Sequence, residues 1–290
     1  MACKTYWLHA ITPVHVGVGM GQGFIDLPIM REKITNWPLI PGSSVKGVLA
    51  DRFTDSTFHK LAFGQGGDDN ANAGAVVFTD ARVICLAARS YYGTFAYVTC
   101  PLALTRLQRD AKSAGLTRFD LNLVTLSEGS AVVPEATSKI SHSAKVCLGE
   151  LDLNCTVSAL ALAWATQIAQ IVFPEQTWNQ IFLERFVVVP DETFNFLCEI
   201  GCEVTARIQL DRDKKIVKRG HFWYEESLPA ESILSGLVWS DRVYQTQDQW
   251  DSDLILEEIC AGEHVLQVGG KANVGKGRMR CCFGGGNGNA

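Results

Sequence analysis

Short runs of apolar residues recur along the chain, and their spacing predicts alternating strands and helices. Large apolar side chains alternate over 4–11, KTYWLHAI, and β-branched and aromatic residues are frequent in 75–88 and 91–100, so each segment is expected to be extended. A helical pattern that follows a proline predicts a helix over 99–115, and the apolar stretch 157–173 predicts a second one. Strands interleaved with helices in this way indicate the α+β fold class.

The second half of the chain is predicted to contain a long hairpin and a glycine-rich loop. In 184–200 a strand gives way to a helix, and 203–228 holds two strands around a polar turn. A final strand precedes the glycine-rich stretch 268–277, VGGKANVGKG. Residues 116–155 are mixed and polar, and we interpret them as an elaboration on the core. Since no boundary divides the chain cleanly, residues 1–290 are predicted to form a single domain.

The start of the predicted helix in 38–53, PLIPGSSVKGVLADRF, is a candidate site for an anion. We expect a turn and then a short amphipathic helix whose first turn is capped by Ser43 or Ser44. Unpaired amide groups and the positive end of the helix dipole attract phosphate at such a position. Lys46 would add a positive charge there, although an ordinary surface lysine is the alternative interpretation.

Composition excludes several classes of protein. The chain has 290 residues, of which 47% are hydrophobic and 20% charged, enough to bury a globular core. Its start lacks the features of a secretory signal, and the apolar stretch 157–173 contains serine, threonine and glutamine, so we expect a soluble cytoplasmic protein with no membrane partner. The ten cysteines are then expected to be reduced thiols. Cys198 and Cys202 lack a second ligand pair, which favours core packing over zinc, and Cys281 and Cys282 are placed in a glycine-rich tail.

Positive charge is concentrated in two short segments of an acidic chain. The formal net charge is −5, yet 207–221 carries +4 and 271–280 carries another +4, which leaves −13 for the rest. The overall charge therefore argues against nonspecific nucleic-acid binding, whereas the two patches provide local contacts for an anion. A solvated hairpin and a solvated tail are the ordinary alternatives.

Two glycine-rich loops frame the chain, and the first of them contains a single aspartate, Asp26. Glycine allows close approach of backbone amides to a phosphate and adopts positive φ, so 268–277 could cradle a phosphodiester. Neither this loop nor 11–33, ITPVHVGVGMGQGFIDLPIMREK, matches the Walker or dinucleotide-binding patterns. An aspartate in such a loop is ordinarily a turn former, so these residues alone leave the role of Asp26 open.

Four segments together resemble the backbone RAMP subunits of Cmr-type (type III-B) CRISPR effector complexes. They are 9–53, with its DLPI-REK sequence and PGSS-KG turn, 78–110, with GTFA-VT-P, the WYEESLPAES segment 223–232, and the glycine-rich 268–280. Only 116–155 matches poorly. The resemblance implies a RAMP fold: a palm of modified RRM or ferredoxin-like type, built from the N- and C-terminal segments, with a glycine-rich C-terminal loop. A β-hairpin called the thumb, about 203–231, would protrude from it.

The resemblance also gives Asp26 a chemical role. In the family the loop after the first strand reaches target RNA, and its aspartate is the residue on which cleavage depends. The carboxylate of Asp26 could hold a divalent metal ion, Mg²⁺ or Mn²⁺, or take the proton of the attacking 2′-hydroxyl. His15 is a second catalytic candidate, with a structural histidine as the alternative. Glu225 and Glu226 are weaker candidates that would approach from the thumb of a neighbouring copy.

The remaining site residues follow from the same motifs. The helix start and the C-terminal loop are expected to bind the guide RNA backbone, through Ser43, Ser44, Lys46, Gly269, Gly270, Lys271, Asn273, Gly275, Lys276 and Arg278. The thumb is expected to contribute basic and aromatic side chains, Lys214, Lys215, Lys218, Arg219, Trp223 and Tyr224. The aromatic pair would stack on a base or anchor the hairpin to the palm.

The resulting hypothesis is a repeated subunit that binds guide RNA and cleaves complementary target RNA at regular intervals. Its partners would be guide RNA, target RNA, further copies stacked head to tail, and the other subunits of a type III-B complex. A non-catalytic scaffold that only binds guide RNA is one alternative. A stand-alone endoribonuclease that processes the guide is the other, and it would use His15 as its base.

Overall fold

Alternating β-strands and helices build the molecule around one large sheet. The computed structural model describes residues 2–19, 21, 23–66, 72–210, 217–241, 243 and 250–284. Its strands are β1 (Cys3–Ala10), β2 (Leu39–Ile40), β3 (Gly64–Gln65), β4 (Asn72–Ala73), β5 (Val76–Phe78), β6 (Ala81–Arg89), β7 (Phe95–Thr99), β8 (Ser130–Val133), β9 (Ser141–His142), β10 (Lys145–Leu148), β11 (Leu151–Val157), β12 (Phe186–Val188), β13 (Glu203–Leu210), β14 (Val217–Ser227), β15 (Ile233–Ser240), β16 (His264–Gln267) and β17 (Arg278–Gly284). Its helices are α1 (Gly42–Ala50), α2 (Ser56–Phe63), α3 (Pro101–Ser113), α4 (Ala159–Val172), α5 (Gln176–Arg185), α6 (Asp191–Ile200), α7 (Ser252–Ile259) and the short 3₁₀ turns η1 (Thr117–Phe119) and η2 (Ala272–Val274).

The main sheet runs in the order β16-β17-β1-β15-β6-β7-β12-β8-β11-β10-β9, with β2 also paired to β6 and β5 to β15. The first and last strands that the structure describes, β1 and β17, therefore lie side by side near the β16 edge, with β1 antiparallel to both β15 and β17. The segment that resembles the family least, 116–155, supplies β8 to β10 and most of β11, which continue this same sheet.

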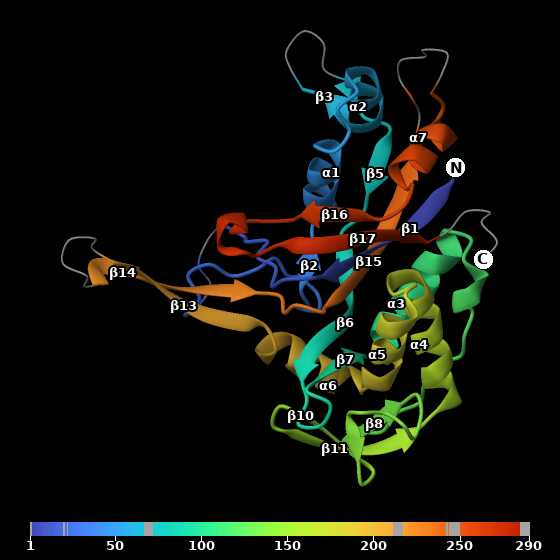
Figure 1. The fold of residues 1–290 in the computed structure, drawn as a ribbon, viewed down its shortest axis with the longest axis vertical. Helices are drawn as coiled ribbons and strands as arrows, with labels where there is room; N and C mark the ends of the chain where they lie inside the picture. The colour runs from blue at the N-terminus through green and yellow to red at the C-terminus, as the bar shows by residue number, and fades with distance from the viewer. Residues whose placement is uncertain are drawn as a thin grey trace.

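Both faces of the sheet are buried at β1, which explains why large apolar residues point to both of its sides. Tyr6 and Leu8 belong to one hydrophobic cluster, to which α1, α2, α6 and α7 contribute, whereas Trp7 belongs to a second cluster with residues of α3, α4 and α5. Successive side chains of a strand point to opposite faces, so each face of β1 needs apolar residues. The helices α3, α4 and α5 gather on one side of the sheet (Figure 1).

The hairpin β13–β14 projects away from the body of the molecule (Figure 1). The two strands pair antiparallel from Glu203 opposite Ser227 to Ile208 opposite Phe222. At the base of the hairpin, the loop between β16 and β17 lies beside the loop that follows β1 (Figure 1). These three segments come from distant parts of the sequence, and they form the surroundings of Asp26.

Three local expectations were wrong. Neither Ser43 nor Ser44 caps α1; the N-cap is Pro41, and the Gly42 N–H donates instead to Asp80 Oδ1 at 2.9 Å. The strand expected over 75–88 is divided into β5 and β6, because the chain turns at Asp80 to provide this cap. The supposed tail forms β17, in which Cys281 is fully buried beside β1.

The remaining expectations about the core are met. The helices expected in 99–115, 157–173 and 184–200 are α3, α4 and α6. Cys198 and Cys202 pack in the hydrophobic core, as expected, and burial raises the pKa of the Cys202 thiol to about 12. Within the part of the chain that the structure describes, no helix combines the length and the apolar composition needed to cross a membrane.

Candidate functional site

The loop after β1 is an ordered ribbon that folds back on itself. The Met30 N–H donates to the Val16 carbonyl oxygen at 2.8 Å, and the Val18 N–H donates to the Pro28 carbonyl oxygen at 3.2 Å. Gly17 and Ile29 form an antiparallel bridge between these two bonds. The arrangement gives a short two-stranded ribbon whose turn includes Gly23 and Phe24. We call residues 16–19, 21 and 23–31 the aspartate ribbon.

Backbone hydrogen bonds attach the aspartate ribbon to the base of the hairpin. The Leu27 N–H donates to the Tyr224 carbonyl oxygen at 3.0 Å, and the Glu226 N–H donates to the Leu27 carbonyl oxygen at 2.9 Å. Between them, the Tyr224 N–H donates to Asp26 Oδ2 at 2.8 Å. The Asp26 side chain is exposed, and its other oxygen, Oδ1, has no hydrogen-bond partner among the described residues. The fold therefore holds one solvent-facing carboxylate oxygen in a fixed position.

His15 joins the three segments from inside. Its Nδ1 lies 2.7 Å from the Glu226 carbonyl oxygen, and since a carbonyl oxygen can only accept, Nδ1 is the donor. The ring is buried, and the His15 carbonyl oxygen accepts from the Gly270 N–H at 2.9 Å. No hydrogen bond connects His15 with Asp26 within the described residues. The geometry gives His15 a structural function, and its part in the chemistry stays a prediction.

Gly269 lets the C-terminal loop approach the ribbon. It has φ +79°, and a Cβ atom there would lie 2.4 Å from the His15 carbonyl oxygen, so a side chain is excluded on both conformational and steric grounds. Gly269 and Gly270 both lie against His15, where they bring the two loops together. Both are also exposed, and their expected contact with RNA stays a prediction. In the same loop, Asn273, Gly275 and Arg278 are exposed and remain candidates for contact with RNA.

Glu225 lies at the centre of a buried charge cluster beneath the hairpin. Its Oε1 accepts from Lys271 Nζ at 2.7 Å and from Trp223 Nε1 at 2.8 Å, and its Oε2 lies 3.3 Å from Arg207 Nε. The residue is 2% exposed. Burial alone would raise the pKa of Glu225, but the bonds from Lys271 and Trp223 and the charges of Lys271 and Lys276 outweigh it and hold the pKa at about 2. Trp223 is thus bonded to this cluster, and its stacking on a base stays a prediction.

Lys276 belongs to the same cluster, and its expected contact with RNA stays a prediction. Its side chain is buried, Nζ donates to Ser227 Oγ at 2.6 Å, and Nζ lies 3.8 Å from Glu225 Oε2. Burial lowers the pKa of this amine, although the Glu225 carboxylate opposes the effect. The sequence pattern GKG could not show that the amine points inward, where it stabilises the hairpin base.

Glu226 is also held internally. Its Oε1 forms an ion pair with Arg31 Nη2 at 2.5 Å, and its Oε2 accepts from the Ile29 N–H at 2.9 Å. Since Glu225 and Glu226 are both buried and paired, neither is free to approach a cleavage site from the hairpin. The sequence did not reveal the Arg31–Glu226 pair: the two residues are 195 positions apart, and no spacing rule connects them.

The remaining predicted RNA-binding residues differ in accessibility. Ser43 is exposed and Ser44 half-buried at the start of α1. Lys46 is half-buried, its Nζ donates to the Val76 carbonyl oxygen at 2.8 Å, and burial lowers its pKa. In the thumb, Lys214 and Lys215 and the side chains of Lys218 and Arg219 lie outside the described residues, so their expected contacts stay predictions.

The carboxylates do not form a ready-made metal centre. Among the described residues there is no group of three His, Cys, Asp or Glu side chains placed to hold one ion. Asp26 nevertheless fits the kind of site in which Mg²⁺ takes one protein carboxylate and completes its shell with substrate phosphates and water, because Oδ1 is free and exposed. Metal binding here would therefore depend on bound RNA.

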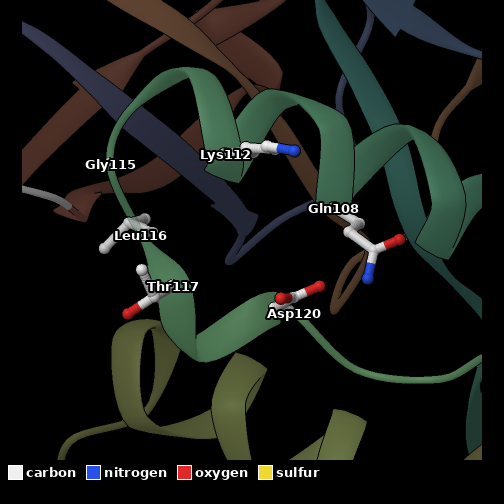
Figure 2. A pocket seen from close by; sticks show the side chains of 6 residues that line it. All are labelled: Gln108, Lys112, Gly115, Leu116, Thr117 and Asp120. Atoms are coloured by element: carbon white, nitrogen blue, oxygen red, sulfur yellow. The ribbon is translucent and has the colours of Figure 1, made fainter.

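A separate small pocket lies between α3 and η1 and has a volume of about 120 Å³ (Figure 2). Gln108 fixes its wall by donating from Nε2 to the carbonyl oxygens of Phe119 and Leu121. None of the predicted site residues lines it; the lining residues are Gln108, Lys112, Gly115, Leu116, Thr117 and Asp120.

Comparisons with known proteins agree on the family. The family model of the RAMP superfamily matches residues 7–280. The CRISPR system Cmr endoribonuclease Cmr4 of Pyrococcus furiosus is 30% identical over 288 residues, which cover 94% of this chain and 92% of that protein. The CMR subunit Cmr4 of Saccharolobus solfataricus is 22% identical, with 94% of each chain covered. The chain therefore belongs to the RAMP superfamily and, within it, to the Cmr4 family.

Solved structures agree on the fold. The crystal structure of oligomeric Cmr4 from Pyrococcus furiosus superposes with a TM-score of 0.76 at 25% identity, covering 99% of this chain and 100% of that one. A chain of a type III-B Cmr-beta complex bound to cognate target RNA gives a TM-score of 0.73 at 19% identity, with 98% and 97% covered. The α+β class and the RAMP fold are thus confirmed.

The buried Glu225 cluster predicts how stability depends on pH. The pKa of Glu225, about 2 in the folded state, lies below the ordinary value of 4.5, so its full stabilising contribution is present above about pH 4.5. As the pH falls towards 2, protonation should remove on the order of 3 kcal/mol from the free energy of unfolding. Urea unfolding across this pH range should show a steeper loss for the wild type than for Glu225→Gln; parallel pH profiles would contradict the assignment.

Proposed function

We propose that this chain is the repeated backbone subunit of a type III-B CRISPR ribonucleoprotein, and that it binds guide RNA and cleaves complementary target RNA through Asp26. The observation that carries the proposal is the geometry of Asp26: an exposed carboxylate fixed by the Tyr224 N–H, where the hairpin and both glycine-rich loops meet. Membership of the Cmr4 family supports it, because the Pyrococcus relative is named an endoribonuclease.

The chemistry follows from one free carboxylate oxygen. Asp26 Oδ1 accepts the proton of a target 2′-hydroxyl, and the 2′-oxygen attacks the adjacent phosphorus. The bond from phosphorus to the 5′-oxygen breaks, and that oxygen takes a proton from water. The products are a 2′,3′-cyclic phosphate and a 5′-hydroxyl. If Oδ1 instead held a divalent metal ion together with the RNA, the ion would supply positive charge to the phosphate as negative charge develops, and water would take the 2′-hydroxyl proton.

The arrangement favours this function over the two alternatives. A scaffold that only binds guide RNA has no need of an exposed carboxylate fixed at the hairpin base. A stand-alone guide-processing enzyme would use His15 as its base, yet His15 is buried and its Nδ1 is committed to the Glu226 carbonyl oxygen. Purified complex offered guide RNA alone, and then guide with complementary target, distinguishes these functions by which strand is cut. Chelation of divalent ions then tests whether metal is needed.

Copies stacked head to tail along one guide predict regularly spaced products. Each copy would place one Asp26 beside the target, so cleavage positions should be separated by a constant number of nucleotides set by the length of the subunit along the RNA. End-labelled targets of two unrelated sequences, each with its own guide, should give the same spacing. Cuts at a single position, or at positions that follow base identity, would contradict the repeated arrangement.

A further inference from the structure

A large aromatic side chain stands exposed at the turn of the aspartate ribbon. Phe24 is 75% exposed, and Val18, on the ribbon's other strand, is 43% exposed. Apolar side chains stabilise a folded protein when they are buried away from water. The exposed ring of Phe24 therefore contributes little to the stability of the fold. The hydrogen bonds of Leu27 with β14 nevertheless hold the ribbon in place, so this ring is presented on an ordered support.

The position of Phe24 ties it to the carboxylate. One residue, Ile25, separates it from Asp26, so covalent geometry keeps their Cα atoms within about 7 Å. On the other side, Tyr224 bonds Asp26 through its N–H, and its ring makes an edge contact with Phe222, with centroids 5.1 Å apart. Phe222 is itself 53% exposed. Aromatic residues of two separate segments therefore lie near Asp26, Phe24 along the chain and Tyr224 through its backbone N–H.

RNA cleavage by a 2′-hydroxyl requires a nucleotide that has left regular helical geometry. The 2′-oxygen, the phosphorus and the leaving 5′-oxygen must come into line, and a continuous stacked helix does not hold them so. Aromatic side chains stabilise unstacked bases without sequence preference, since every base has a π-face. A target that varies with each guide needs this kind of contact, because it does not depend on base identity.

We propose that Phe24 stacks on the unpaired target base next to the scissile phosphate and holds that nucleotide in the geometry for attack. The inference rests on the proposed function and deepens it by assigning a substrate-positioning residue. Arg207 and Lys271 remain part-exposed beside Glu225 at the hairpin base, and their positive charge favours an RNA phosphate nearby.

The test uses the reconstituted complex with guide RNA and a target that carries a single abasic nucleotide, moved position by position through one cleavage interval. Phe24→Ala should slow single-turnover cleavage by about five- to a hundredfold, the range of a lost base–aromatic stack. Phe24→Tyr should restore the rate, because it keeps the ring. Ile34→Ala removes an apolar side chain that is 81% exposed in a nearby turn, and it should cleave as the wild type does.

The abasic target distinguishes base stacking from a purely structural role of Phe24, because a structural role would not make the cleavage rate depend on one particular base. At one position in the interval, the missing base should slow the wild type about as much as Phe24→Ala does, and it should slow Phe24→Ala no further. The inference would be overturned if the missing base and Phe24→Ala slowed cleavage independently at every position, so that their effects multiplied. It would also be overturned if Phe24→Ala cleaved at the wild-type rate. Either result would leave the function of Asp26 intact. Loss of assembly by Phe24→Ala in native mass spectra would also overturn the inference, in favour of a protein contact. Failure of the wild type to cut any target would overturn the proposed function as well.

Discussion

A complex carrying Asp26→Asn is expected to cleave target RNA roughly 10²-fold more slowly, or worse, than the wild type. Asparagine keeps the size of the side chain, and its Oδ1 can still accept from the Tyr224 N–H, so the aspartate ribbon should remain attached to the hairpin. What is lost is the negative charge that takes a proton or holds a metal ion. Guide and target binding should stay close to wild-type values, because the predicted phosphate contacts come from other residues.

Asp51→Asn is the matched control for this variant. Asp51 is an exposed aspartate at the C-terminal end of α1, where the same change of charge should leave cleavage unaltered. Single-turnover rate constants with saturating complex separate chemistry from binding, and filter binding of an uncleavable target gives the affinity. A parallel loss of affinity and rate would show that Asp26 supports the RNA-binding surface instead of the chemistry.

Replacement of Glu225 by glutamine should lower the free energy of unfolding substantially. The variant leaves Lys271, Lys276 and Arg207 close together without the carboxylate that compensates them. Breaking a buried ion pair by removing one partner typically costs about 3–5 kcal/mol. Denaturant unfolding of the isolated subunit should show a decrease of this size, and the hairpin base should lose protection from hydrogen exchange first.

Two further variants decide whether charge is the cause. Adding Lys276→Met to Glu225→Gln removes one of the uncompensated cations and should recover part of the lost stability, because Lys276 is buried against Glu225. Glu257→Gln changes an exposed glutamate of α7 and should shift the free energy of unfolding by less than about 0.5 kcal/mol. A decrease of less than about 1 kcal/mol for Glu225→Gln would mean that the cluster contributes little.

Local sequence patterns predicted the elements that carry their own signals, such as a capping residue or an unbroken run of buried side chains. β1 could be predicted because its residues from Thr5 to Ala10 are all buried, and α4 because its capping serine, Ser158, precedes a long apolar run. α7 was not predicted, although Asp251 caps it by accepting from the N–H groups of Asp253 and Leu254. Its N-terminal signal is short and follows a polar stretch, so no periodicity indicated it.

Contacts between distant segments could not be predicted in this way. Asp80 caps α1 from 38 positions further along the chain, so the serines beside the helix start were a misleading local signal. The charge count correctly indicated a basic segment around Lys271 and Lys276. It could not show that Glu225, on another strand, neutralises part of that charge inside the molecule.

The motif resemblance identified Asp26, and the structure explains its position. The ribbon is held by Tyr224, 198 positions away, through a backbone N–H that no sequence pattern specifies. The glycines of the C-terminal loop were interpreted as phosphate ligands, whereas Gly269 is required for its close approach to His15. Glycine-rich composition indicates close approach of backbone, but it does not indicate whether protein or ligand lies on the other side.

The central claim is that this chain itself supplies the catalytic group at every cut. It is tested most directly by complexes in which only this subunit carries Asp26→Asn while all other subunits are wild type, with target products mapped at single-nucleotide resolution beside the wild-type complex. The account predicts that every one of the regularly spaced products disappears together while the target stays bound. Persistence of any of these products at the wild-type rate would contradict it.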